Sequence, residues 1–227
     1  MAGFTASTLY TQDIPGQGWS NAIQMGLYGR YTEGDAYLDG VAGYARADNR
    51  MTRTIIFPSV YRVAYGQTSA DQFFGQLEAG YKFGLSVPNS FLTPFARLQA
   101  STVTQAGFSE TGADSLNLNV AAATTNSLRT VLGGLLGGKI ETVNLIFRLG
   151  WSHEYANTAL PVTATFAGAP SFAFTTFGAT APRDGAVVGL AADTLVGEAT
   201  SLYFRYDGEV QGGNTNHTLT AGVRYVW

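Results

Sequence analysis

Apolar and polar residues alternate along most of this chain with a period of two. In "SLYFRYDGEV", Leu202, Phe204 and Tyr206 fall on one side of an extended chain, and Arg205 and Asp207 fall on the other. The same alternation runs through "NLIFRLGWSHEY", "GQLEAGYKF" and "NAIQMGLYGRY". Strict alternation of this kind predicts β-strands that have one apolar face and one polar face.

Ten segments follow this pattern, and we predict that each forms a strand. They cover residues 2–10, 21–31, 35–54, 61–84, 92–107, 116–137, 144–156, 184–195, 201–211 and 217–227. Several are longer than the ~5–6 residues usual for strands of soluble domains. They reach the ~9–11 residues of strands that cross a membrane at a tilt.

The connections between these segments differ in length in a regular way. Short turns are expected at 32–35, 86–90, 139–143 and 197–200, and longer links at 11–20, 108–115 and 157–183. Short turns at one end and long loops at the other are typical of outer-membrane β-barrels, whose short turns are periplasmic. By this parity, the C-terminus is also expected at the periplasmic end.

Composition excludes several classes of protein. Charged residues make up 13% of the chain, about half the usual share of a soluble domain. The 13 basic and 16 acidic residues nearly balance, so no basic surface favours nucleic acid. The absence of cysteine excludes a disulfide framework, a thiolate metal site and a cysteine nucleophile. No apolar run approaches the ~18 residues of a membrane-spanning helix.

The charged residues distinguish a membrane barrel from a soluble β-sandwich, the alternative all-β fold. A sandwich would expose a face rich in Lys and Glu, whereas this chain has two lysines and polar faces of mixed sign. We predict that these charges face a barrel lumen, where they can pair across strands. The predicted lumen-facing residues are Arg30, Asp39, Glu78, Lys82, Arg97, Arg129, Arg148, Glu154, Asp193, Arg205, Asp207, Glu209 and Arg224.

The apolar faces carry aromatic residues near the ends of the predicted strands. Transmembrane barrels place such residues in girdles at the two membrane interfaces. The predicted girdle comprises Tyr31, Tyr81, Phe83, Trp151, Tyr155 and Tyr206. The fold class expected from the pattern is therefore all-β, an antiparallel transmembrane β-barrel.

Several phrases, taken in order, resemble the autotransporter β-domain over nearly the whole chain. They include "MGLYGRYTEGDAYLDGVAGYAR", "GFSETGA", "FRLGWSHEYANT", "FAGAPSFAF", "RDGAVVGLAAD" and "LTAGVRYVW". The resemblance implies a twelve-stranded barrel in the bacterial outer membrane that exports and displays an N-terminal passenger segment. It also implies assembly by the outer-membrane insertion machinery. Gly222, Tyr225 and Trp227 fit the family's assembly signal, Gly-x-x-aromatic-x-aromatic.

The first predicted strand lines up with about the third strand of that family. Residues 1–227 are therefore expected to be the C-terminal portion of a longer protein, with about ten of twelve strands visible. The signal peptide, the passenger, the pore helix and the first two strands are expected to lie outside this sequence. The expected partners are outer-membrane lipids, the assembly machinery and the chain's own passenger, with no nucleic acid and no cofactor.

Two other functions fit the same fold. One is a self-standing outer-membrane protease or lipase, in which His153 or His217 pairs with a nearby carboxylate such as Glu154, Asp207 or Glu209. The other is a passive porin or an adhesin-like barrel. His153 shares its face with aromatic residues, which favours a place at the membrane interface, and no enzyme is expected. The run "GGLLGG" (133–138) lacks the Lys-Ser/Thr ending of a phosphate loop, so its glycines are expected to relieve crowding in a strand.

Overall fold

Ten long strands form one antiparallel sheet in which consecutive strands lie side by side. The computed structural model describes residues 1–11, 16–178 and 180–225. The order across the sheet is β1-β2-β3-β4-β6-β9-β10-β13-β14-β15. The strands are β1 (Ala2–Thr11), β2 (Gly16–Glu33), β3 (Ala36–Phe57), β4 (Val60–Tyr81), β6 (Ser90–Gln105), β9 (Ala123–Ile140), β10 (Val143–Glu154), β13 (Asp184–Leu195), β14 (Thr200–Gln211) and β15 (Asn214–Tyr225), with the short β5 (Phe83–Gly84) beside β6. Each of the ten predicted segments overlaps one of these ten strands, and several strands are longer than predicted, such as β2, which covers Gly16–Glu33 where 21–31 was expected.

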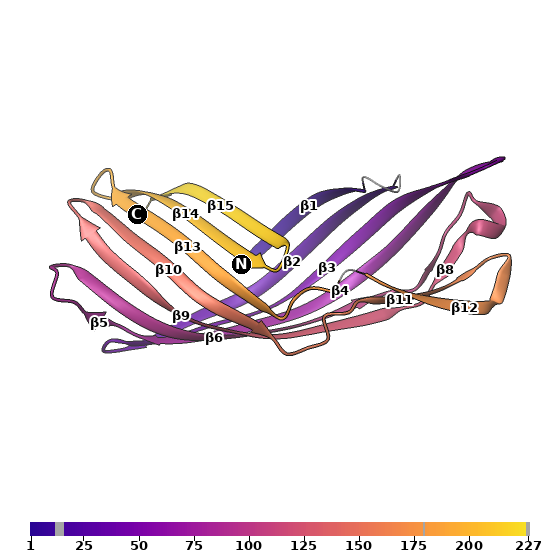
Figure 1. The fold of residues 1–227 in the computed structure, drawn as a ribbon. Helices are drawn as coiled ribbons and strands as arrows, with labels where there is room; N and C mark the ends of the chain where they lie inside the picture. Colours follow the sequence, from indigo (N-terminus) through magenta and orange to yellow (C-terminus); the bar gives the residue numbers. More distant parts are fainter. Residues whose placement is uncertain (12–15, 179, 226–227) are drawn as a thin grey trace.

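The sheet is curled into a half-barrel (Figure 1). The strands lie side by side at a common tilt, and the curl gives the sheet a concave and a convex face. Among the described residues, β1 pairs only with β2 and β15 only with β14, so the two form the free edges of the sheet. The fold class is the predicted one, and the sheet is an open half-barrel in this structure.

The two ends of the wall differ in part as the pattern of connections predicted; the exceptions at the loop end are the two-residue turns at 58–59 and 212–213 and the predicted link 11–20, since β1 reaches Thr11 and β2 begins at Gly16. Tight turns at 34–35, 86–89, 141–142 and 196–199 lie at one end, which we call the turn end. At the opposite, loop end, β3 and β4 run on as a hairpin of 22 residues per strand. The pairing of β4 with β6 stops at Ala70, so the outer part of this hairpin projects beyond the neighbouring wall.

A second, smaller sheet occupies the loop end, where the sequence predicted long irregular links. Its order is β12-β11-β8-β7, built from Ala169–Phe177, Pro161–Phe166, Leu118–Val120 and Phe108–Ser109. A single 3-10 turn, Asp114–Leu116, lies between β7 and β8. The interpretation of 108–115 and 157–183 as loops was therefore wrong in part, and the predicted strand 116–137 begins later, at Ala123.

The smaller sheet continues the wall outward from β4. Tyr65 of β4 and Thr111 exchange backbone hydrogen bonds of 2.8 and 2.9 Å. Glu110, whose side chain is buried, accepts hydrogen bonds from Arg53 of β3 and from the backbone N–H of Leu118. Because these contacts join both strands of the projecting hairpin to the chain around β7 and β8, the second sheet is fixed to the wall.

Little of the apolar surface is buried within the protein. Among the described residues, the buried apolar side chains are Ala45, Ala64, Phe95, Ala113, Val131 and Ala164. Large apolar side chains on the convex face are exposed; Phe147 is 43% exposed and Leu149 is 53% exposed. An exposed apolar surface of this extent marks a face that contacts a membrane or another protein. No helix in the described part of the chain is both long and apolar enough to cross a membrane.

Candidate functional site

The concave face carries a row of charged side chains at one level of the wall. Asp39 of β3 lies opposite Arg30 of β2 on one side and opposite Glu78 of β4 on the other. Glu78 in turn lies opposite Arg97 of β6. Because residues directly opposite each other in a sheet share a face, all four side chains point into the concavity, with the two carboxylates in the middle of the row and an arginine at each end.

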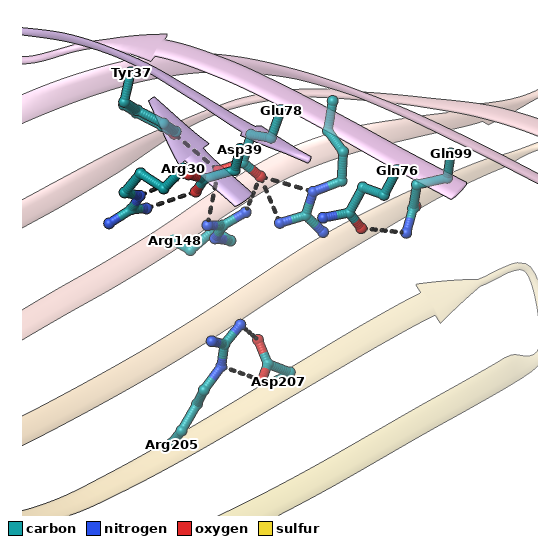
Figure 2. Close-up of polar contacts among 10 residues, drawn as sticks. Arg30, Tyr37, Asp39, Gln76, Glu78, Gln99, Arg148, Arg205 and Asp207 are labelled. Atoms are coloured by element: carbon teal, nitrogen blue, oxygen red, sulfur yellow. Dashed lines mark hydrogen bonds and ion pairs between the residues drawn. The ribbon is translucent and has the colours of Figure 1, made fainter. Parts of the chain in front are cut away.

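Glu78 is the centre of this row (Figure 2). Its carboxylate accepts a hydrogen bond of 2.7 Å from Nε of Arg97 and one of 2.9 Å from Nη1 of Arg148. The hydroxyl of Tyr37 donates a third, of 2.8 Å. The side chain of Glu78 is 5% exposed, and those of Arg97 and Arg148 are 17% and 15% exposed. One buried carboxylate therefore forms ion pairs with two arginines.

Arg148 reaches Glu78 across two intervening strands, β6 and β9. Its guanidinium carbon lies 4.5 Å from the centre of the Phe95 ring, a cation–π distance. A Cβ atom at Gly133 of β9 would lie 2.9 Å from this ring and closer still to the backbone of β10. The run 133–138 is thus part of a strand, as predicted, and the absence of a side chain at Gly133 leaves room for the Phe95 ring.

The remaining predicted charges also lie on the concave face, in separate contacts. Arg30 binds Asp39 and Arg205 binds Asp207 through paired hydrogen bonds (Figure 2). The other contacts join Arg129 to Glu209, Lys82 to the Phe91 ring, Arg224 to the Tyr203 ring, Asp193 to Asn144, and Glu154 to Ser127 and the backbone of Leu128 and Ala156. The alternation in the sequence assigned these residues to the polar side of their strands and gave no indication of their partners.

These side chains border an open cavity of about 630 Å³ in the concavity. Eight of the strands contribute to its lining, and the predicted residues in it are Arg30, Asp39, Glu78, Lys82, Arg97, Arg148, Arg205 and Asp207. The uncharged Gln76 also lines the cavity and accepts a hydrogen bond from Gln99. The charged groups that line the cavity are thus nearly balanced in sign, and they offer both donors and acceptors to a hydrated ligand or chain.

The predicted girdle residues lie on the convex face, at different levels. Tyr31 and the contacting pair Tyr81 and Phe83 lie near the turn end. Trp151 and Tyr155 lie near the loop end of β10. Tyr206 is in the middle of β14, where its hydroxyl lies 2.8 Å from Nδ1 of His217. It therefore belongs to neither end.

The structure adds an aromatic pair at the loop end that the sequence analysis missed. The rings of Tyr44 and Phe73 are 5.1 Å apart on the convex face. Immediately beyond them, Asp71 accepts hydrogen bonds from Tyr44 and from Arg46 on that same face. A change from aromatic to charged residues along one face is the signal that could have marked the membrane boundary here.

The contacts given for the two histidines in the described part of the chain do not include Glu154, Asp207 or Glu209, the carboxylates considered for a hydrolase. His153 contacts Asp184 of β13, with 2.9 Å between Nδ1 and Oδ1, and Trp151 donates to the same carboxylate. This cluster lies on the convex face, whereas Glu154 points into the concavity. Within the described ranges, the contacts of His153 and His217 include no serine or threonine that could act as a nucleophile.

The last strand holds part of the predicted assembly signal. A Cβ at Gly222 would lie 2.6 Å from the ring carbon Cζ of Tyr203 on β14, so the phenol ring lies directly over this glycine. Tyr225 ends β15 and is exposed at the turn end. Trp227, the third predicted member, lies outside the described residues.

Comparison with known proteins gives a family and a fold. A sequence model of the "Autotransporter beta-domain" matches residues 1–207. Two proteins named "Outer membrane protein A", from Rickettsia rickettsii and from Rickettsia conorii (strain ATCC VR-613 / Malish 7), are each 32% identical over 125 residues. These matches cover 51% of this chain, and the chain spans only 5% and 6% of those two relatives.

Among solved structures, the translocator domain of the autotransporter NalP from Neisseria meningitidis has the same fold. The TM-score is 0.73 at 20% sequence identity, over 99% of this chain and 73% of that domain. At this identity, the likeness concerns the arrangement of the strands and not the chemistry of particular side chains.

Proposed function

The chain belongs to the autotransporter β-domain family and is an outer-membrane translocator domain, and on that premise we propose a separate role for each of its two faces. The convex face contacts the lipid, and the concave face is the wall of a polar channel for a passenger segment of the same polypeptide. The observation that carries this proposal is the contrast between the faces. Exposed apolar side chains cover the convex face, and the charge network around Glu78 lies on the concave face.

The polar wall suits a passing polypeptide because it is balanced in sign. An unfolded chain presents backbone N–H and C=O groups and side chains of both charges. A wall in which arginines and carboxylates already neutralise one another holds none of them strongly. The network also makes the wall rigid, since each charged group is fixed by one or more partners.

We further propose that the half-barrel is part of a twelve-stranded barrel whose other strands belong to the same polypeptide. The free edges of β1 and β15 support this, since an unpaired edge cannot face lipid without leaving backbone groups unsatisfied. In that barrel, the turn end is periplasmic and the loop end is extracellular. The passenger would precede these strands and emerge at the loop end.

We propose that Gly222, Tyr225 and Trp227 form the signal read by the outer-membrane assembly machinery. The close approach of Tyr203 to Gly222 supports a role for the glycine in the packing of the last two strands. Deletion of Trp227 should lower the amount of folded, heat-modifiable barrel in outer membranes. Normal levels after the deletion would leave the terminal residue as an interfacial anchor alone.

The function proposed here is transport and anchoring without catalysis. It is tested by placing an epitope in the N-terminal region of the full-length protein, in the native bacterium. Antibody should reach the epitope on intact cells, and deletion of residues 1–227 should abolish this signal while leaving the epitope inside the cell envelope. Undiminished surface signal after the deletion would contradict the proposal.

A further inference from the structure

Arg46 and Arg50 of β3 differ from the other basic residues of the wall in the face that they occupy. Both are at even-numbered positions of β3, whereas Asp39 and the concave face of this strand are at odd-numbered positions. Every other lysine and arginine in the ten described strands has the register of the concave face. Within these strands, the convex face therefore carries basic charge at one place only, and both arginines there are exposed.

This place is at the height of the outer headgroup layer of a membrane. Arg50 is about 15 residues along β3 from the turn at 34–35. At a rise of ~3.3 Å per residue and a tilt of ~40°, its backbone lies about 38 Å from that turn along the membrane normal. A bilayer has a hydrocarbon core of ~30 Å and a total thickness of ~40–45 Å. Because the turn itself lies outside the core, Arg50 reaches the headgroups of the opposite, outer leaflet.

Arg50 lies in a row of hydrogen-bond donors on the convex face. Trp19 of β2 is directly opposite Arg50 on one side, and Gln67 of β4 is directly opposite it on the other. All three side chains are exposed. Within the described ranges, none of them has a hydrogen-bond or ion-pair partner. The row therefore presents guanidinium, indole and amide N–H groups that can all donate to one acceptor.

The nearby carboxylates leave this row open to an anion. Asp71 accepts hydrogen bonds from Tyr44 and Arg46, nearer the turn end. Asp48 lies between the two arginines along β3, on the same face. It offsets part of their charge, so the patch has little net charge. Recognition of an anion here depends on directed hydrogen bonds from Arg50 and its neighbours in the row.

We propose that Arg50, Trp19 and Gln67 bind a phosphate group of a glycolipid in the outer leaflet. The planar guanidinium of arginine donates two parallel hydrogen bonds to phosphate oxygens, a geometry that carboxamides and indoles can extend from either side. The acyl chains of the same lipid would lie along the exposed apolar side chains of Ile23 and Phe73, which are on the convex face toward the turn end. This inference rests on the proposed contact of the convex face with lipid, and it adds a specific headgroup site to that contact.

The test removes one positive charge from the row and compares it with the same loss elsewhere. Arg50→Gln keeps a polar side chain but no charge. Lys139→Gln is the matched control, because Lys139 is also exposed and lies at the turn end of β9. The full-length protein is purified in a non-ionic detergent, and its binding is measured by microscale thermophoresis. The probes are lipid A with two phosphates and the same lipid with both phosphates removed.

Arg50→Gln should weaken the binding of the phosphorylated lipid about tenfold, the effect of one lost charge-assisted hydrogen bond, and Lys139→Gln should leave it unchanged. Removal of the phosphates should weaken binding to the wild-type protein by a similar factor. Equal affinities of the two variants, or of the two lipids for the wild-type protein, would overturn the phosphate site alone. Binding of neither lipid to the wild-type protein would overturn the lipid-facing role of the convex face as well. Gel mobility of the folded barrel checks that each variant is folded.

Discussion

Glu78→Gln removes the one carboxylate that holds Arg97 and Arg148 together on the concave face. The amide has nearly the same shape, so the change is electrostatic. Two guanidinium groups, 17% and 15% exposed, would then lose the carboxylate that they share. Removing one partner of a buried ion pair typically costs ~3–5 kcal/mol. Because the concavity is open to water, we expect the lower end of that range, about 3 kcal/mol.

The matched control is Asp39→Asn in the neighbouring pair of the same row. The side chain of Arg30 is 63% exposed, so the loss of its partner should cost less than ~1 kcal/mol. Urea unfolding of the full-length protein in detergent micelles, followed by the gel mobility of the folded barrel, gives both free energies of unfolding. A cost for Glu78→Gln no greater than that for Asp39→Asn would refute the argument that Glu78 is the centre of the network.

Three further predictions concern the two faces and the last strand. Phe147→Lys puts a charge on the lipid face near the middle of β10 and should lower the free energy of unfolding in bilayers by ~2–4 kcal/mol. Ile146 lines the cavity, so Ile146→Lys should be tolerated. Gly222→Val should reduce folded barrel in outer membranes, because its Cβ overlaps the Tyr203 ring, and Tyr203→Ala should restore it; no rescue would place the defect elsewhere. Arg205→Glu should leave insertion intact and change single-channel conductance in planar bilayers, and unchanged conductance would argue against a place on the channel wall.

The sequence predicted the strands and the face of each charge because both follow from one period. A residue's face within a strand is fixed by its parity, so Glu78 and Arg148 could each be assigned to the polar side. Their mutual contact could not be predicted. It joins β4 to β10 over two other strands, and only the curvature of the sheet and the glycine at 133 bring the side chains together.

The second sheet was missed for a different reason. Two of its strands, Phe108–Ser109 and Leu118–Val120, are very short. The hairpin around Gly168 alternates poorly because small residues and threonines occupy both of its faces. Their pairing depends on the projecting β3–β4 hairpin. Glu110 and Arg53 are 57 residues apart in sequence, and no local pattern relates them.

Disulfide trapping in the concavity tests the central claim most directly, because the chain contains no cysteine of its own. Gln76 lines the cavity, and the next residue, Leu77, is 55% exposed on the convex face. Each is replaced by cysteine in turn in the full-length protein, and a second cysteine is placed in the passenger, whose export is arrested midway by a folded insert. We predict a disulfide between passenger and barrel with cysteine at 76 and none with cysteine at 77. Trapping at 77 alone, or equally at both positions, would contradict the claim that the concave face is the channel wall.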